Sequence, residues 1–295
     1  MKNYIQILFI FLMLPLVAVA QEDDTKKEKK VKEKLERSAF ESATLINNPT
    51  NVLFKKNTLE VMLQHRFGLM NNGGANDLAG FWAPSNIRIG LSYAIHDRVT
   101  IGYGTTKDKR LQDFNWKVAL LQQTRSNKMP VSVTYYGNFT VDARKKNNGY
   151  FINLQDRYSN FNQLIIAKRF NPKFSAQIAP SVSHYNIVEN TMRNDMVAIA
   201  FGGRYKISDQ TSILVDYSQP LTKFLQDNPP PGISFGVEFG TSSHTFSIFA
   251  TNYNGIVPQQ NYMFNQNDGF GVDSPFGKGG GDFLIGFNIT RNYNF

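Results

Sequence analysis

Apolar and polar residues alternate with period two from about residue 58 to the end of the chain. In the first such stretch Leu59, Val61 and Leu63 alternate with Glu60 and Gln64. Alternation of this kind gives a β-strand one apolar face and one polar face. The pattern recurs in about twelve stretches and therefore predicts an all-β fold. The apolar faces of the stretches begin at Leu59, Ile87, Val99, Phe114, Val131, Leu164, Phe174, Val197, Ile213, Ile233, Phe246 and Phe283.

One stretch is ambiguous in its facing. Residues 161–170 contain Leu164, Ile165 and Ile166, so both parities are apolar there. We assign Leu164 and Ile166 to the same face as the other apolar residues, and the inverted facing stays open.

The connections between stretches alternate between tight turns and mostly longer segments. The tight turns carry Asp, Asn, Ser and Pro, the residues that favour turns. Tight turns on one side and long loops on the other are typical of outer-membrane barrels, whose periplasmic turns are short and whose extracellular loops are long. The longer segments are 70–84, 143–160, 187–195, 219–231 and 253–281.

The polar faces of the stretches carry charged residues that a dry sandwich core would not tolerate. The stretches are also about nine to twelve residues long, whereas strands of soluble proteins average five or six. A transmembrane antiparallel up-and-down β-barrel with a wet lumen fits both observations better than a soluble sandwich or lipocalin-type barrel. The predicted lumen-facing residues are Glu60, Arg66, Arg88, Lys117, Arg204, Lys206, Asp216, Glu238 and Asp282.

The N-terminus predicts export. Lys2 precedes an almost wholly apolar run over residues 5–19, and Ala18-Val19-Ala20 forms a small-residue cleavage site. We interpret residues 1–20 as a cleaved signal peptide; a single membrane anchor is the alternative, but the run is short for a span. Residues 21–57 are then a charged periplasmic N-terminal segment, and residues 58–295 form the barrel.

The charge balance by itself resembles that of a nucleic-acid-binding protein, with a net charge of +9. Much of the excess lies in residues 22–37, where both signs are mixed, and a solvated tail explains this better. We therefore predict no nucleic-acid partner for the exported chain. The absence of cysteine excludes disulfides, thiol nucleophiles and cysteine-bound metals.

The last predicted strand keeps its apolar parity through Phe283, Ile285, Phe287 and Ile289, and Phe295 follows in phase. This pattern resembles the C-terminal targeting strand that the barrel assembly machinery reads, so Phe295 is a predicted assembly signal. The expected partners are outer-membrane lipid, the barrel assembly machinery and other envelope proteins.

Four segments carry a narrower resemblance. They are residues 40–47 (Phe-Glu-Ser-Ala-Thr-Leu-Ile-Asn), 58–60, 65–68 (His-Arg-Phe-Gly) and 85–93. From about Phe40 to its end the chain resembles an uncharacterised outer-membrane β-barrel family of Bacteroidota. The resemblance implies an outer-membrane barrel and brings no activity, substrate or catalytic residue with it.

Catalytic patterns are weak. The histidines are His65, His96, His184 and His244, and only Ser242 and His244 have the spacing of two that a Ser-His pair on one strand face needs. Acidic residues in the loops are scattered without metal-ligand spacing. The sequence therefore predicts no enzyme, no metal site and no cofactor.

The lumen carries the clearest functional signal. Its predicted charges are nearly balanced, and a barrel of about twelve strands is intermediate between filled and channel-forming barrels. The charges could therefore line a narrow open pore or brace a plug, and both remain open. We predict a narrow, porin-like channel for small solutes; the alternatives are a structural or partner subunit of an envelope complex and, third, an outer-membrane hydrolase.

Overall fold

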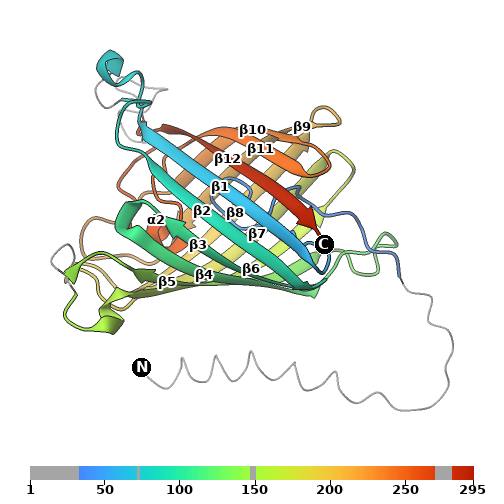
Figure 1. Ribbon diagram of the computed structural model, residues 1–295, viewed down its shortest axis with the longest axis horizontal. Helices are drawn as coiled ribbons and strands as arrows, with labels where there is room; N and C mark the ends of the chain where they lie inside the picture. Colours follow the sequence, from blue (N-terminus) through green and yellow to red (C-terminus); the bar gives the residue numbers. More distant parts are fainter. Residues whose placement is uncertain (1–32, 72–73, 147–150, 270–280) are drawn as a thin grey trace, which may run out of the picture. The chain divides into compact units, whose positions relative to one another are not determined.

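The computed structural model describes residues 33–71, 74–146, 151–269 and 281–295. Within these ranges twelve antiparallel strands each pair with their neighbours in the chain, and β12 pairs with β1 to close the barrel (Figure 1). The predicted up-and-down barrel is thus confirmed. Its strands are β1 (Thr58–Leu69), β2 (Asn86–His96), β3 (Val99–Thr106), β4 (Leu111–Leu121), β5 (Ser132–Asp142), β6 (Tyr158–Arg169), β7 (Phe174–Tyr185), β8 (Asp195–Lys206), β9 (Thr211–Pro220), β10 (Gly232–Gly240), β11 (His244–Thr251) and β12 (Leu284–Asn294).

The alternation in the sequence becomes the two faces of the barrel wall. On β2, for example, Ile89 and Leu91 are exposed on the outside while Gly90 is buried. On β6, Ile165 is fully buried inside and its neighbours Leu164 and Ile166 face outward, as assigned from the sequence. Large apolar side chains can stay on the outside because hydrocarbon, not water, is the solvent there.

The connections alternate in length as predicted, with two exceptions. The connections after β2, β6, β8 and β10 have four residues or fewer, but the one after β4 spans residues 122–131 and the one after β3 only residues 107–110. The connections after β1, β3 and β5 hold the 3-10 helices η2 (Gly74–Asp77), η3 (Asp108–Arg110) and η5 (Leu154–Arg157). In the described ranges no helix is long and apolar enough to cross a membrane. The predicted signal peptide, residues 1–20, and most of the charged stretch 22–37 lie outside the described residues.

Residues 39–52 lie inside the barrel rather than in a periplasmic segment. Leu35 forms a bridge to Thr124 at the short-turn end, and the chain then enters the barrel. Residues 43–50 form a small hairpin, in which Leu45 N donates to Asn48 O over 2.9 Å and Thr50 N donates to Ala43 O over 3.0 Å. We call residues 43–50 the interior hairpin. The first strand begins at Thr58, but residues 39–52 do not form the periplasmic segment that the sequence predicts, because their apolar side chains are buried against the barrel wall.

A second segment fills the barrel from the long-loop end. The connection from β11 to β12, predicted as an extracellular loop, folds inward over its first part and forms helix α2 (Pro258–Phe264). The helix packs against β6, β7 and β8, and its residues 258–263 are buried. Figure 1, a side view of the barrel, shows α2 at the level of the strands. The barrel interior is thus occupied from both ends.

Candidate functional site in the barrel interior

The interior has an apolar half and a polar half. The apolar half comes mainly from β6 to β9 and packs against the interior hairpin and α2. Its small and apolar wall residues form a water-free packing surface for the two inserted segments, the interior hairpin and α2. The principal contacting residues are Phe161, Ile165, Met196 and Leu214 of the wall, Leu45 and Ile46 of the hairpin, and Tyr262 and Met263 of α2.

Asp216 on β9 holds the tip of the interior hairpin. Its carboxylate accepts hydrogen bonds from the backbone N–H of Asn47 over 2.9 Å, from that of Asn48 over 3.1 Å and from Asn48 Nδ2 over 2.6 Å. Asp216 is 2% exposed. A buried carboxylate is tolerated only when its oxygens are hydrogen-bonded, and the hairpin supplies the donors.

Arg66 on β1 also binds the tip of the interior hairpin, from another part of the wall than Asp216 on β9. Its Nη2 donates to Ile46 O over 3.1 Å and to Asn47 Oδ1 over 3.0 Å, and its Nη1 donates to Asn288 Oδ1 over 3.0 Å. The guanidinium also lies 4.5 Å from the centre of the Phe249 ring. Arg66 and Asp216 thus fix the hairpin tip by charge-assisted hydrogen bonds.

Two further predicted cations also contact the N-terminal segment. Lys117 Nζ donates to Ala43 O over 2.6 Å. Arg204 bridges Glu238 of the wall over 2.9 Å and Glu41 of the segment over 3.0 Å. Four predicted residues of the barrel wall therefore hold one inserted segment.

The two inserted segments meet in the middle of the barrel. Tyr262 Oη of α2 donates to Asn48 Oδ1 of the hairpin, and lies 3.2 Å from Ser218 Oγ of the wall. Gln259 Nε2 donates to Asn138 Oδ1 over 2.9 Å and to Thr140 Oγ1 over 2.8 Å. Side chains therefore connect the interior hairpin, α2 and the wall, and within the described residues neither inserted segment pairs with a strand of the wall.

Arg88 and Asp113 form a bidentate pair across β3. Arg88 Nε and Nη2 lie 2.8 Å and 2.7 Å from the two carboxylate oxygens, and Arg88 Nη1 donates to Gln64 Oε1 over 3.0 Å. The Arg88 side chain can lie flat along the inner face of the wall because Gly90 and Gly104, which it covers, carry no Cβ. A Cβ built at Gly104 would collide with Arg88 Nη2 and Asp113 Oδ2.

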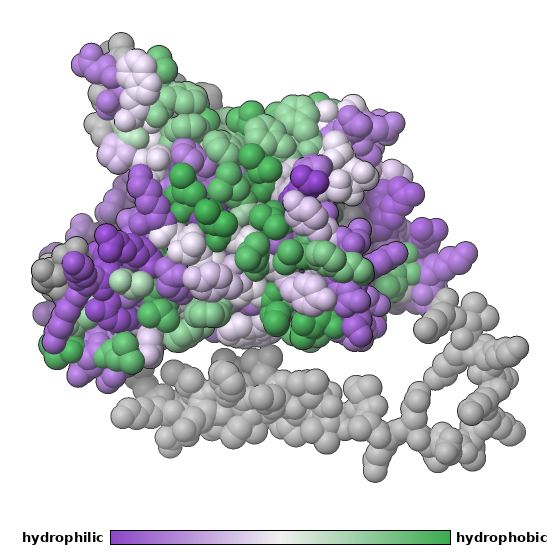
Figure 2. All heavy atoms as spheres, in the orientation of Figure 1, coloured by the Kyte–Doolittle hydropathy of each residue, from purple (hydrophilic) through white to green (hydrophobic). Residues whose placement is uncertain are grey.

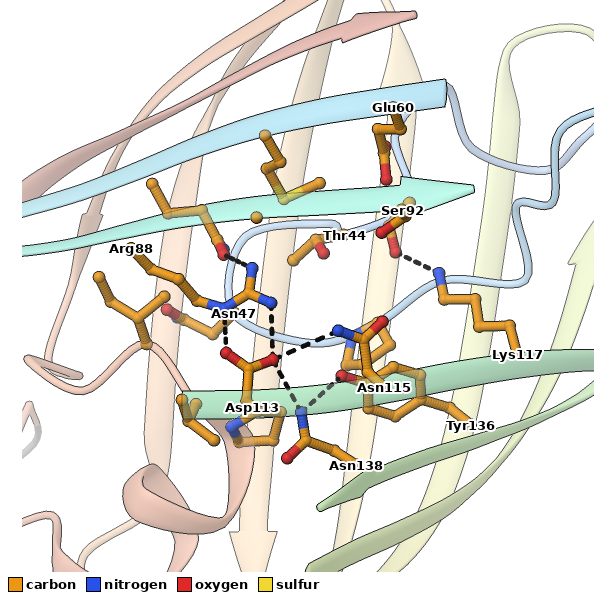
Figure 3. Close-up of a pocket in the computed structure, with 18 residues that line it drawn as sticks. Thr44, Asn47, Glu60, Arg88, Ser92, Asp113, Asn115, Lys117, Tyr136 and Asn138 are labelled. Carbon is orange, nitrogen blue, oxygen red and sulfur yellow. Dashed lines mark hydrogen bonds and ion pairs between the residues drawn. The ribbon is translucent and has the colours of Figure 1, made fainter. Parts of the chain in front are cut away.

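A small polar cavity remains between the hairpin and the β1–β5 wall (Figure 3). It holds about 50 Å³, enough for a few water molecules and too little for a sugar or an amino acid. Glu60 and Lys117 flank it, and Figure 3 shows Arg88 and Asp113 at its other end. Glu60 is 2% exposed, and its Oε1 has no hydrogen-bond partner among the described residues.

Two predicted lumen residues lie elsewhere. Lys206 is at the end of β8, where its Nζ is 3.9 Å from Asp209 in the following turn. Asp282 precedes β12 and accepts a hydrogen bond from Asn71 Nδ2 over 2.8 Å in the long-loop region. The strand begins only at Leu284, so the prediction that Asp282 faces the lumen was wrong.

Sequence reasoning missed several interior residues. Asp113 shares the parity of Lys117 on β4, so the same rule that selected Lys117 could have found it. Gly102 and Gly104 repeat with period two on the inner face of β3, which is a signal for close packing over a strand. Asn47 and Asn48 carried no such signal, because their partners are 169 and 168 positions away in the chain.

The histidines do not converge on a nucleophile. His65 faces outward, and its ring stacks on Phe287 at 5.0 Å. His184 Nδ1 lies 2.7 Å from Asp195 Oδ1, and its Nε2 lies 3.1 Å from Asn186 Oδ1. Within the described ranges no three His, Asp or Glu side chains are grouped as a metal site. The predicted assembly residue Phe295 follows β12 and is exposed.

One protein-family model matches most of the chain. A family model described as "Membrane bound beta barrel domain (DUF5777)" matches residues 40–293. No curated protein matches the sequence.

Several solved outer-membrane proteins are similar in structure. A KdgM porin has a TM-score of 0.46 at 5% identity, covering 81% of this chain and 99% of the porin. An outer membrane channel from Pseudomonas putida F1 has a TM-score of 0.45 at 12% identity, covering 82% of this chain and 97% of the channel. OmpT of Vibrio cholerae has a TM-score of 0.38 at 8% identity, covering 82% of this chain and all (100%) of OmpT. A closed antiparallel barrel with an apolar outer face is the form in which β-strands span the bacterial outer membrane. The chain is an outer-membrane β-barrel and belongs to the family of membrane bound beta barrel domains (DUF5777).

Proposed function

We propose that the protein is a narrow outer-membrane channel for small polar solutes, closed in this structure by the interior hairpin. The observation that carries the proposal is the asymmetry of the interior. The hairpin and α2 pack their apolar side chains mainly against β6 to β9. The β1–β5 wall instead carries charged side chains, and a cavity lies between it and the hairpin.

The closed state rests on side-chain contacts that can be broken without unpairing a strand. Lys117 contacts the segment only through the carbonyl of Ala43, and Glu60 has an oxygen without a partner. Release of the hairpin from the barrel wall would enlarge the cavity and expose both side chains. A passage along this wall would be polar and of mixed charge, which suits small polar solutes.

A disulfide lock tests the proposal. Ser42 Oγ and Thr290 Oγ1 are 3.3 Å apart, and both residues are buried at the root of the hairpin and on β12. The chain has no cysteine, so Ser42→Cys with Thr290→Cys introduces a single pair at positions whose hydroxyl oxygens are in hydrogen-bond contact. In planar bilayers we expect small, brief conductance steps from the unmodified protein, at least tenfold fewer from the oxidised pair, and recovery on reduction.

The single variants Ser42→Cys and Thr290→Cys are the controls, and oxidant should leave their conductance unchanged. Equal conductance of the oxidised and reduced pair would contradict the hairpin as the gate. Absence of conductance from every form would contradict the channel itself.

The second candidate is a non-conducting partner subunit of an envelope complex. Its support is the direct contact between Tyr262 and Asn48, which joins the two inserted segments in the middle of the barrel. This candidate predicts no conductance together with co-purification of other envelope proteins.

A hydrolase has the least support. Both ring nitrogens of His184 are within hydrogen-bond distance of Asp195 and Asn186, while the neighbouring Ser183 is buried on the other face of β7. We therefore propose no enzymatic activity, and expect His184→Ala to leave any measured transport unchanged.

A further inference from the structure

Two connections at the long-loop end of the barrel bring four exposed cations together at one sector of the rim. Lys107 and Arg110 lie in the β3–β4 connection, and Lys145 and Lys146 lie in the β5–β6 connection. The two connections touch, because Ala143 N donates to Arg110 O over 3.4 Å. We call Lys107, Arg110, Lys145 and Lys146 the basic rim. Figure 2 shows hydrophilic residues gathered at this end of the strands.

The acidic residues nearby are engaged elsewhere. Asp108 Oδ2 accepts a hydrogen bond from Gln260 Nε2 of α2 over 2.7 Å. Asp142 pairs with Arg144 over 2.7 Å, and this hydrogen bonding raises the pKa of the Arg144 guanidinium. In the part of the chain that the structure describes, no member of the basic rim forms a salt bridge. Residues 107–110 and 142–146 together hold six cations and two carboxylates, so this sector of the rim has an excess of positive charge.

An apolar groove runs along the outer face of the same sector. It has a volume of about 550 Å³, within the range of ligand pockets, and its walls include Leu91, Ile101, Tyr103 and Phe114. Trp116 forms another wall. A Cβ built at Gly137 of β5 would collide with the indole, so the ring lies over that glycine.

The groove has two cross-strand rows of apolar side chains: the upper row contains Leu91, Tyr103 and Phe114, and the lower row, with Ile101 and Trp116, lies nearer the short turns. Tyr103 pairs with Phe114 across β3 and β4, and the β3–β4 connection begins at Lys107. Four residues at about 3.3 Å each place the rim about 13 Å beyond the upper wall of the groove. Headgroups occupy the layer immediately outside the hydrocarbon, so an acyl chain in the groove would bring its headgroup to the cations.

We propose that this groove and the basic rim form a binding site for a phosphate-bearing, acylated lipid of the outer leaflet. The long connections of outer-membrane barrels lie on the outer side, so the rim faces that leaflet. The excess of lysine and arginine side chains attracts an anionic headgroup, and the groove takes the acyl chain. The inference does not depend on whether the barrel conducts.

Trp116 supplies the readout for a competition test. The chain has two tryptophans, so Trp82→Phe leaves Trp116 as the only one. Vesicles of phosphatidylcholine with brominated acyl chains quench its fluorescence, and unbrominated bisphosphorylated lipid A is added in increasing mole fraction. We expect fluorescence to recover at a mole fraction at least fivefold below that for simple dilution of the brominated lipid.

Charge removal gives the matched comparison. Lys145→Gln with Lys146→Gln should move the recovery midpoint at least fivefold upward, because each cation near an anionic headgroup contributes about fivefold in affinity. Arg125→Gln with Lys173→Gln removes the same charge from two exposed positions at the short-turn end, away from the groove, and should leave the midpoint unchanged. Inorganic phosphate alone should cause no recovery. Recovery that follows simple dilution in the parent protein, or equal midpoints in the two double variants, would overturn the site.

Discussion

Glycines on the inner face of β2 and β3 determine where the charges of the interior can lie. Gly90 and Gly104 are cross-strand partners. The Arg88 side chain lies over both glycines on the inner face and reaches Asp113. The pair is largely withdrawn from water, with side-chain exposures of 11% and 0%. Breaking such a pair leaves a buried charge uncompensated, so the glycines are required for packing rather than for flexibility.

We predict that Gly104→Ala destabilises the folded barrel by about 1–3 kcal/mol, the usual cost of overpacking. The added methyl group would displace Arg88 Nη2 from Asp113. Urea unfolding in lipid vesicles, followed by heat-modifiable migration on gels, measures the change. Gly203→Ala on β8 is the matched control, because a Cβ there meets nothing within 4 Å. Equal stability of the two variants would show that Arg88 relocates without cost.

At Asp216 a single carboxylate holds the hairpin tip. In Asp216→Asn one oxygen becomes an amide nitrogen that faces backbone N–H donors, which costs about 1–3 kcal/mol. We expect more frequent conductance openings and faster protease cleavage within residues 39–52. Ser212→Ala on the same strand is the control, since the Ser212 hydroxyl is buried without a partner. Unchanged openings in Asp216→Asn would mean that Asp216 does not hold the gate.

Among the elements, the interior hairpin is the one that depends most on packing against others. It has a single short bridge of its own, between Thr44 and Pro49, and is otherwise held by the barrel. Ile46 is fully buried at its tip, in the apolar cluster that includes Ile165 and Leu214. Its position therefore depends on tertiary contacts and not on local propensity.

We predict that Ile46→Ala detaches the hairpin while the barrel stays folded. Truncation of a buried isoleucine costs about 2–5 kcal/mol, and the cost falls on the hairpin rather than on the strand ladder. Trypsin cleavage at Arg37 should accelerate, with heat-modifiable migration unchanged. Leu91→Ala, a truncation on the outer face, should leave the cleavage rate at its original value. Loss of the folded band in Ile46→Ala would instead make the hairpin part of the barrel's own core.

In the molecule as a whole, closure of the barrel places both ends of the strand ladder at one rim. Thr58 at the start of β1 pairs with Asn294 at the end of β12, and the short turns lie at that same end. In outer-membrane barrels the short turns are periplasmic, so the long connections face outward.

Cysteine labelling tests this orientation in a chain without native cysteine. We expect a membrane-impermeant maleimide to label Glu189→Cys, in the β7–β8 connection, on intact cells. Lys173→Cys, in a short turn, should be labelled only after the outer membrane is permeabilised. The reverse pattern would invert the orientation and remove the outer leaflet as the source of the proposed lipid.

The sequence by itself determined the strands, the direction in which their side chains face and the closed barrel. Residues two positions apart in a strand lie on the same face, so alternation in the sequence is enough to assign each side chain to a face. The same rule placed Glu60, Arg66, Arg88 and Asp216 on the inner face and could have added Asp113. Only the tertiary structure decided that the interior is filled. Residues 39–52 and α2 lack the period of two, and their partners are distant in the chain: Asn48 meets Tyr262, 214 positions away. Such contacts arise when the closed wall offers a buried surface of matching shape and charge, which no local pattern encodes.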